Sequence, residues 1–308
     1  MVYDLIIIGA GPAGMTAAIY AARNKLKFLM ISLDIGGQVS WSSEVDNYPG
    51  LPDCTGIEIV NKFKEHLKDY KIKVKIEEVK EIKKIKNFFK IKTKNKEYKT
   101  KTIILASGKK PKKLNVPGEE KFLGKGVSYC TTCEINPYKN KKVAIIGGGN
   151  SGLEAALFLT KHCKKVYVVE ILDQINGEEF LKEKVKKNKK IKVITGARVK
   201  EILGNQKVHS IKYEKSNRVE SLKIEGIFIE IGLITILDFA KIIKKNQWNE
   251  IMIFRSTKTH EENMTNIPGI FAAGDCTDIP TKQIVVAAGE GAKAALAAID
   301  YINRTDKK

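Results

Sequence analysis

Two cysteines, Cys130 and Cys133, are separated by two residues and followed directly by Glu134. A pair with this spacing can close a small disulfide ring that exchanges with another disulfide, supply half of a zinc site, or be two unpaired thiols of the core. Zinc needs two more ligands, and the four histidines are scattered singly through the sequence. A redox dithiol is therefore favoured, with Glu134 placed to move a thiol proton or simply to cap a helix.

A redox disulfide needs a source of electron pairs, and a glycine motif that occurs twice indicates one. The motif G-x-G-x-x-G spans Gly9–Gly14 and again Gly147–Gly152, each time between a β-branched strand and an Ala-rich helix. There the first glycine permits a tight turn, the second lets the backbone approach a pyrophosphate, and the third lets helix and strand pack closely. Two copies predict two dinucleotide sites, the second comprising Gly147, Gly149, Asn150, Ser151 and Gly152.

The strand that follows the second motif ends at Glu170. A carboxylate at this point accepts hydrogen bonds from the ribose 2′-hydroxyl of NADH and repels the 2′-phosphate of NADPH. The loop Ile171–Glu179 has no Lys or Arg that would bind such a phosphate. NADH is therefore favoured over NADPH, the alternative being a glutamate that only ends its strand.

Strands and helices alternate along the rest of the chain, which is typical of an α/β fold. The Ala-rich segment that ends near Tyr301 predicts a terminal helix, and its apolar face needs the first dinucleotide domain to pack on. The other predicted helices cover residues 57–71 and 178–187, and the predicted strands cover 73–76, 89–93, 102–105, 192–195, 226–231 and 270–273, with a hairpin over 199–215.

Composition narrows the class of protein. The chain has 308 residues, enough for two domains, and its 55 Lys and Arg against 35 Asp and Glu give a formal net charge of +20. The cations are mostly lysines that alternate with Ile and Val, as on solvated faces, so nucleic-acid binding is disfavoured. No secretory signal or run of ~18 apolar residues is present, which predicts a cytoplasmic protein without a membrane span. We interpret Cys54, Cys163 and Cys276 as structural.

Several further motifs, in the same order along the chain, make the sequence similar to the low-molecular-weight thioredoxin reductases. From Gly226 onward it resembles most closely the NADH-using flavoprotein subunit of alkyl hydroperoxide reductase, without the N-terminal thioredoxin-like domain of that subunit. The motifs that carry the resemblance are Gly36-Gly37-Gln38, Asp46–Gly50, Ala106-Ser107-Gly108, Asn115–Gly118, and Gly269–Asp275 with Lys282-Gln283.

The resemblance implies an α/β fold of two Rossmann-like dinucleotide-binding domains, with the nicotinamide domain inserted in the FAD domain. Residues 1–113 and 244–308 would form the FAD-binding domain, and residues 114–243 the NAD(P)H-binding domain that carries the Cys-x-x-Cys pair. The FAD would lie along Gly9, Gly11, Pro12, Ala13, Gly14, Asp34, Gly36, Gly37, Gln38, Asn47, Ala106, Gly108, Gly274, Asp275, Lys282, Gln283 and Ile284.

The resemblance also implies a reaction. Electrons would pass from NADH, less readily NADPH, through FAD to the Cys130–Cys133 disulfide, and from there to thioredoxin or a glutaredoxin-like protein. Cys133 would face the flavin and Cys130 would attack the partner. A homodimer with a rotating nicotinamide domain is implied as well. The alternatives are a peroxiredoxin system as final acceptor, ferredoxin as the electron source, and a non-enzymatic dinucleotide sensor or scaffold.

The sequence departs from the family pattern at three places. The arginine-bearing loop that holds NADPH is replaced by the segment Glu170–Glu179, which supports NADH. The usual Asp-Gly after the second cysteine is Glu134-Ile135 here. The expected Pro-Asn-Thr turn reads Thr235-Ile236-Leu237, and this change keeps ferredoxin open as an electron donor.

Overall fold

The computed structural model describes residues 1–42, 45, 47–131, 135–255 and 261–305. The chain forms two compact units, one made of Met1–Lys110 with Ile234–Lys308 and the other of Pro111–Leu233. We call them unit 1 and unit 2. Unit 2 is an insertion in unit 1, so the predicted α/β fold, in which one Rossmann-like domain interrupts another, is confirmed.

The chain returns to unit 1 earlier than predicted. We placed the return after residue 243, whereas unit 2 ends at Leu233. The reason is hydrophobic burial, because Leu237, Ala240 and Ile243 belong to a buried core cluster of unit 1. The chain passes from one unit to the other within two short strands, which pair as a two-stranded sheet. They are β7 (Lys110–Pro111) and β16 (Leu233–Ile234).

Unit 1 is built on one sheet in the order β3-β2-β1-β6-β5-β4, with β17 also paired to β6. The strands β3, β2, β1, β6 and β17 run parallel, while β5 and β4 extend the sheet as an antiparallel hairpin. Its strands are β1 (Val2–Ile8), β2 (Phe28–Ser32), β3 (Val74–Ile76), β4 (Val79–Ile85), β5 (Phe88–Thr93), β6 (Glu97–Leu105) and β17 (Ile270–Ala272).

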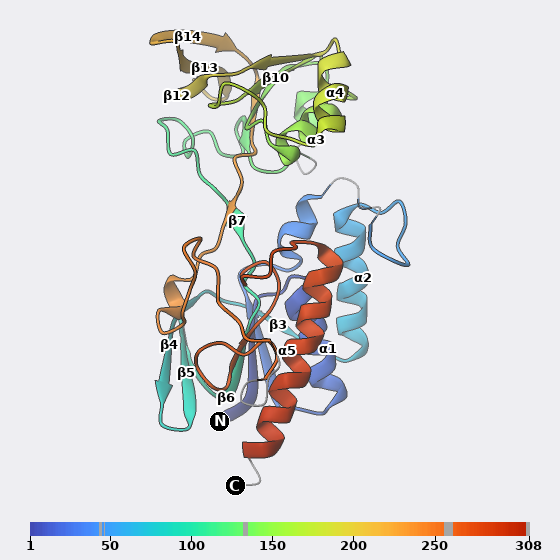
Figure 1. The fold of residues 1–308 in the computed structure, drawn as a ribbon, viewed down its shortest axis with the longest axis vertical. Helices are drawn as coiled ribbons and strands as arrows, with labels where there is room; N and C mark the ends of the chain where they lie inside the picture. The colour runs from blue at the N-terminus through green and yellow to red at the C-terminus, as the bar shows by residue number, and fades with distance from the viewer. Residues whose placement is uncertain (43–44, 46, 132–134, 256–260, 306–308) are drawn as a thin grey trace. The chain divides into compact units, whose positions relative to one another are not determined.

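Helices α1, α2 and α5 lie together beside this sheet (Figure 1). Their bounds are α1 (Pro12–Arg23), α2 (Gly56–Asp69) and α5 (Ile284–Thr305). Unit 1 also contains the short 3-10 helices η1 (Gly37–Trp41) and η3 (Asp238–Ala240). The terminal helix α5 packs on α1 as predicted. A Cβ on Gly291 of α5 would lie 2.1 Å from the carbonyl oxygen of Ala13 in α1, so only glycine allows this approach.

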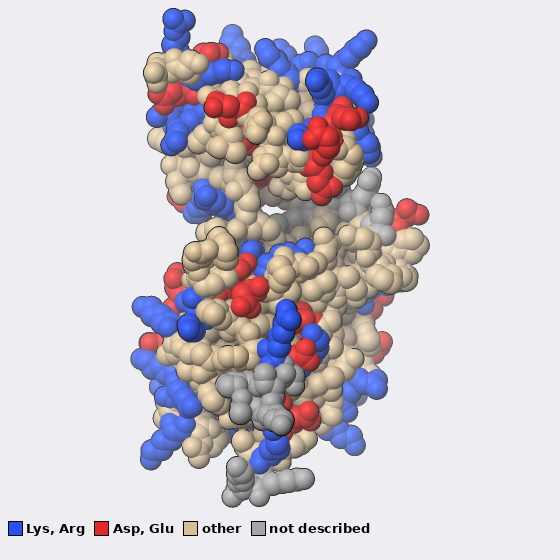
Figure 2. Space-filling model, in the orientation of Figure 1, with Lys and Arg blue, Asp and Glu red and all other residues tan. Residues whose placement is uncertain are grey.

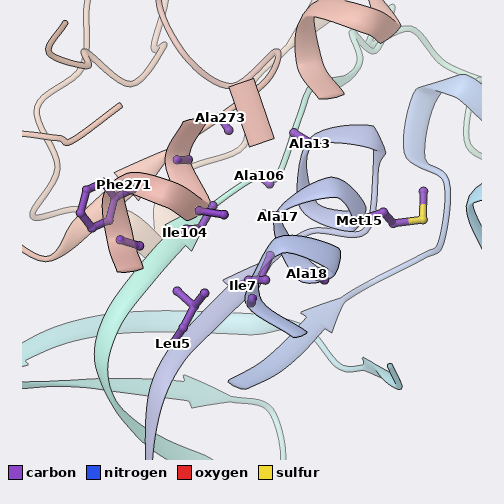
Figure 3. Packing of buried hydrophobic residues seen from close by; sticks show 14 of the residues in the cluster. Leu5, Ile7, Ala13, Met15, Ala17, Ala18, Ile104, Ala106, Phe271 and Ala273 are labelled. Atoms are coloured by element: carbon purple, nitrogen blue, oxygen red, sulfur yellow. The ribbon is translucent and has the colours of Figure 1, made fainter. Parts of the chain in front are cut away.

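The core between α1 and the sheet combines alanines on the helix with larger apolar side chains on the strands (Figure 3). Leu5, Ile7 and Ile104 on the strands are fully buried beneath Ala17 and Ala18 on the helix. Alanines on one helix face let the helix lie close to the sheet, which brings the N-terminus of α1 to the carboxyl end of β1.

Unit 2 repeats the arrangement on a smaller scale, with the parallel sheet order β11-β10-β9-β15-β8 and a separate antiparallel sheet β12-β13-β14. Its strands are β8 (Val127–Ser128), β9 (Lys142–Ile146), β10 (Lys165–Val169), β11 (Ile191–Ile194), β12 (Ala197–Gly204), β13 (Val208–Lys215), β14 (Arg218–Lys223) and β15 (Gly226–Ile229). Its helices are α3 (Asn150–Leu159), α4 (Glu179–Lys187) and the short 3-10 helix η2 (Asn136–Tyr138).

Surface lysines on the visible face are interspersed with carboxylates (Figure 2). Oppositely charged side chains on neighbouring strands form ion pairs. Lys90 Nζ on β5, for example, lies 2.7 Å from Glu97 Oε2 on β6. Such exposed pairs each contribute little stability, which fits the interpretation of these lysines as a solvated face. Within the part of the chain that the structure describes, no helix has the length and apolar character that crossing a membrane requires.

Candidate functional site

The glycine turn of unit 1 follows β1 and leads into α1. Gly9 has φ of 112°, and a Cβ there would lie 2.1 Å from the carbonyl oxygen of Ala106. A Cβ on Gly14 would lie 1.9 Å from the carbonyl oxygen of Gly9. Both glycines are therefore required by the protein itself, one for the turn and one for the contact between helix and strand.

Gly11, the middle glycine, is different. Its φ of −82° suits any residue, and a Cβ there would find its nearest neighbour, the carbonyl oxygen of Gly36, at 3.9 Å. No described protein atom requires a glycine at this position. Gly11 is also the N-cap of α1, whose first turn has no acidic residue, and Pro12 is at the first helical position. The open backbone and the helix N-terminus together fit an anionic pyrophosphate.

Other predicted FAD residues converge on this turn from distant parts of the sequence. The backbone N–H of Gly36 donates to Ala10 O at 2.7 Å, and the Gln38 side chain donates to Asp275 Oδ2 at 3.1 Å. The side-chain amide of Asn47 donates to Gln283 Oε1 at 3.1 Å. The remaining predicted positions also belong to unit 1, at Asp34, Gly37, Ala106, Gly108, Gly274, Lys282 and Ile284.

Asp275 is a partly buried carboxyl whose charge is only partly compensated. Burial raises its pKa, and the nearby Lys282 and the Gln38 amide oppose that rise. Lys282 also lies 3.3 Å from Glu250, whose carboxylate meets Lys109 at 3.0 Å. This network was missed by the sequence analysis, because Lys109 and Glu250 carry no motif. It connects the segment that follows β17 to Lys109, which lies after β6.

The glycine turn of unit 2 has the same division of roles. Gly147 has φ of 116°, and a Cβ there would lie 2.2 Å from Glu230 O, while a Cβ on Gly152 would lie 2.1 Å from Gly147 O. Gly149 has an ordinary φ of −82°, and a Cβ there would meet nothing within 4 Å. The second turn thus also leaves its middle glycine open for a ligand.

Glu170 is buried, and its carboxylate binds the turn itself. Oε2 accepts the backbone N–H of Gly148 at 2.5 Å, and Oε1 accepts that of Leu172 at 2.8 Å. The sequence predicts that this side chain binds a ribose hydroxyl. The structure places it beside the glycine turn, as that assignment requires, and adds that the carboxylate holds the turn in shape.

The acidic loop after Glu170 folds back over the same turn. Asn176 N donates to Gly148 O at 2.9 Å, and Asn150 and Glu178 exchange two hydrogen bonds, of 3.1 Å and 2.7 Å. Glu230 directly follows β15, and the Ser151 hydroxyl donates a hydrogen bond to its carboxyl. Burial first, and then the Glu154 carboxylate, raises the pKa of Glu230 to about 7. This carboxyl was also missed, since it lies in a strand pattern that predicts only core residues.

Cys130 lies two residues after the short strand β8 and is 9% exposed. It is disulfide-bonded, whereas Cys54, Cys163 and Cys276 are free. Burial raises the pKa of Cys163 to about 11 and also raises that of Cys276, so both are poor nucleophiles. Cys133 and Glu134 lie outside the described residues. In the part of the chain that the structure describes, no group of three or more His, Cys, Asp or Glu side chains could hold a metal ion.

The altered turn at Thr235 has a structural explanation. The Thr235 hydroxyl donates to Asn249 O at 2.5 Å, and the Asn249 side-chain amide donates to Thr235 O at 3.1 Å. Thr235 is 5% exposed, while its neighbours Ile234 and Ile236 are 45% and 42% exposed. The hydroxyl thus fixes this turn to the turn at Asn249, both within unit 1.

Comparison with known proteins agrees with these features. The family model described as pyridine nucleotide-disulphide oxidoreductase matches residues 3–291. The chain belongs to this family. Membership implies an oxidoreductase that uses FAD and a pyridine nucleotide, and the two glycine turns with open middle glycines fit both groups.

Individual members of the family share most of this chain. An NADH dehydrogenase of Ferdinandcohnia aciditolerans is 36% identical over 98% of this chain, and the F subunit of an alkyl hydroperoxide reductase of Xanthomonas campestris pv. phaseoli is 35% identical over 98%. The chain spans 58% of the length of each. The crystal structure of Lactococcus lactis thioredoxin reductase matches with a TM-score of 0.87 and 35% identity, covering 98% of this chain and 99% of that one. The predicted resemblance is confirmed.

Proposed function

We propose that this oxidoreductase carries electrons from NADH, through FAD, to a Cys130–Cys133 disulfide and on to a disulfide of a small thioredoxin-like protein. The observation that carries the proposal is a disulfide-bonded Cys130 in a chain with two glycine turns that each leave the middle glycine open. Two turns fit two dinucleotides, and a disulfide is an acceptor for the electron pair that they exchange.

The two units would divide the cofactors. Unit 1 would hold FAD at Gly11, with Gln38, Asp275 and neighbouring residues along its length, and unit 2 would hold the nucleotide at Gly149. Bound FAD would supply the two-electron relay between the nucleotide and the disulfide. The helix N-termini would stabilise the pyrophosphates, and the buried side chains around each turn would hold its shape.

The partner of Cys130 in the disulfide would be Cys133, because the other three cysteines are free. Taking up two electrons and two protons converts the disulfide to two thiols. The Cys130 thiolate would then attack one sulfur of the partner's disulfide. Cys133 would attack the resulting mixed disulfide, which restores the ring and leaves two thiols on the partner. Glu134 would exchange the proton that the attacking thiol loses.

NADH is proposed over NADPH on electrostatic grounds. The carboxylate of Glu170 lies at the glycine turn, and Glu178 is bonded to Asn150 in the same turn. A 2′-phosphate would meet these negative charges, and the loop that joins them contains no Lys or Arg. The name of the relative from Ferdinandcohnia aciditolerans, an NADH dehydrogenase, supports the same choice.

A peroxiredoxin system is the second candidate for the final acceptor. It is favoured by the similarity to the F subunit of alkyl hydroperoxide reductase, of which this chain spans 58%. The chemistry up to the Cys130 thiolate would be the same. The two candidates differ only in the protein whose disulfide is reduced.

Steady-state turnover tests the proposal. Purified protein holding FAD is mixed with NADH and either thioredoxin or a glutaredoxin-like protein, and NADH oxidation is followed with NADPH as the matched control. We expect turnover with NADH that exceeds turnover with NADPH and is lost in the Cys130→Ser variant. NADH oxidation that continues unchanged in Cys130→Ser would contradict the disulfide route. Addition of a peroxiredoxin and a peroxide distinguishes the second candidate.

A further inference from the structure

Glu119 of unit 2 is a buried carboxylate with three hydrogen-bond donors. The residue is 2% exposed. Its two oxygens accept the backbone N–H groups of Leu114, at 2.8 Å, and Asn115, at 2.6 Å. The third donor is the hydroxyl of Tyr129, 2.5 Å from Oε1. A carboxylate this deeply buried is unfavourable unless hydrogen bonds replace its hydration, and these three bonds do so.

The turn that carries Glu119 is firmly held. Asn115 and Gly118 have φ of 57° and 92°, and a Cβ on Gly118 would lie 2.1 Å from the carbonyl oxygen of Ile202. The backbone N–H of Ile202 in β12 donates to Pro117 O at 2.9 Å. The Glu119 side chain therefore extends from a turn that is anchored to a neighbouring sheet.

Tyr129 stands directly before Cys130 in the chain. Burial, and then the Glu119 carboxylate, raises the pKa of Tyr129, so its hydroxyl stays protonated and donates. On the other side of the tyrosine, Ser128 is 3% exposed, and its hydroxyl accepts from Cys130 N and donates to Cys130 O, both at 3.1 Å. The backbone of Cys130 is thus held by Ser128, and the residue before it is held by Glu119.

We propose that Glu119 and Tyr129 are positioning residues that hold Cys130 in the geometry required for disulfide exchange. The inference rests on the proposed function, because it takes Cys130 as the redox cysteine. A hydrogen bond to a carboxylate is directional and strong, so it can fix a tyrosine ring and with it the backbone of the next residue. Exchange needs the attacking sulfur in line with the disulfide that it attacks, and an unanchored segment meets that condition less often.

The test uses two variants and one matched control in the full chain holding FAD. Tyr129→Phe removes the hydroxyl, and Glu119→Gln removes the charge of the acceptor. The control is Tyr213→Phe, because the Tyr213 hydroxyl donates to Glu220 Oε2 at 2.7 Å on β13 and β14 of the same unit. Both tyrosine variants lose one bond to a carboxylate, and only one of them adjoins Cys130.

Two readouts separate positioning from general stability. The first is the rate at which iodoacetamide alkylates Cys130 after reduction with dithiothreitol. The second is kcat and KM for NADH-driven reduction of thioredoxin. For Tyr129→Phe and Glu119→Gln we expect alkylation about tenfold faster, kcat about tenfold lower and an unchanged KM for NADH, as expected for loss of one charged hydrogen bond. Tyr213→Phe should stay within about twofold of the wild type.

The outcomes decide the inference. If Tyr129→Phe matches Tyr213→Phe in both readouts, the pair has only a structural role and the inference is overturned. Should Tyr129→Phe fail to fold, Glu119→Gln decides by the same comparison. The double variant Glu119→Gln/Tyr129→Phe gives a further check. If the effects of the two substitutions on alkylation and kcat add in full, the inference is also overturned, because the bond between Tyr129 and Glu119 can be lost only once. The alkylation readout needs neither nucleotide nor partner, so it still tests the positioning of Cys130 if the wild type shows no NADH-driven turnover.

Discussion

The open space at the middle glycine of each turn leads to a sharp prediction. In Gly149→Ala the new Cβ meets no protein atom within 4 Å, and the φ of −82° and ψ of −177° are ordinary for alanine. Replacing a glycine N-cap by alanine costs roughly 0.5–1 kcal/mol, and the smaller conformational entropy of the unfolded chain offsets about 0.4–1 kcal/mol. The free energy of unfolding should therefore change by no more than about 0.5 kcal/mol.

Gly152→Ala is the matched comparison, three positions along the same turn. Its Cβ would lie 2.1 Å from Gly147 O, where real contacts are no shorter than 3.0 Å, so α3 has to move by about an ångström. Displacement of this kind in a close-packed contact costs about 3 kcal/mol. Gly152→Ala should therefore lower stability, while Gly149→Ala should not.

Binding should respond differently from stability. Because the methyl group of Gly149→Ala occupies the space proposed for the pyrophosphate, we expect NADH to bind at least about tenfold more weakly, equivalent to about 1.4 kcal/mol. Urea unfolding measures the stability, and NADH fluorescence measures the dissociation constant. A stable Gly149→Ala protein that binds NADH as tightly as the wild type would refute the assignment of the turn. Gly11→Ala should likewise retain less FAD on purification.

Three further predictions concern acids and thiols. Because the pKa of Glu230 is raised from 4.5 to about 7, the folded state keeps a proton that the unfolded state has lost in this pH range. The free energy of unfolding should therefore fall between pH 4.5 and about pH 7. Glu230→Gln should remove this fall and be more stable than the wild type by up to about 3 kcal/mol at pH 8, measured by thermal or urea unfolding. Glu170→Gln should lower stability by about 1–3 kcal/mol and narrow the preference for NADH in paired binding titrations, and an unchanged preference would show that another group contacts the ribose. After reduction, iodoacetamide should label Cys130 well before Cys163, whose thiol is buried, and equal labelling measured by mass spectrometry would contradict the assignment of Cys163 as inert.

The parts of the fold that sequence predicts well are those fixed by local constraints. Both glycine turns were predicted with their strands and helices, because the three glycines of the motif are set by the local geometry of a tight turn between a strand and a helix. The predicted helix over 57–71 is α2, which begins at Gly56 because Thr55 forms a capping box with Glu58. Two edge strands, β4 and β14, were missed, because their many charged residues obscure the alternation of a strand.

The parts that sequence did not predict depend on contacts between distant segments. Glu119 directly follows the Asn115–Gly118 motif, and nothing in that motif indicates that the Glu119 carboxylate accepts a hydrogen bond from Tyr129. The hydrogen bond that Glu170 accepts from the backbone of Gly148 depends on the ends of β9 and β10 lying side by side in the sheet. The early return of the chain at Leu233 follows from burial in a core that only the folded unit defines.

The central claim is that an electron pair from NADH reaches the disulfide of Cys130 by way of bound FAD. Anaerobic titration with NADH, followed at the flavin absorption band with a thiol count after each addition, tests it most directly. The account predicts flavin bleaching, new thiols, and about twice the NADH consumption of the Cys130→Ser variant, because one two-electron acceptor is lost. A flavin that NADH does not bleach, or one that bleaches without new thiols, would contradict the account.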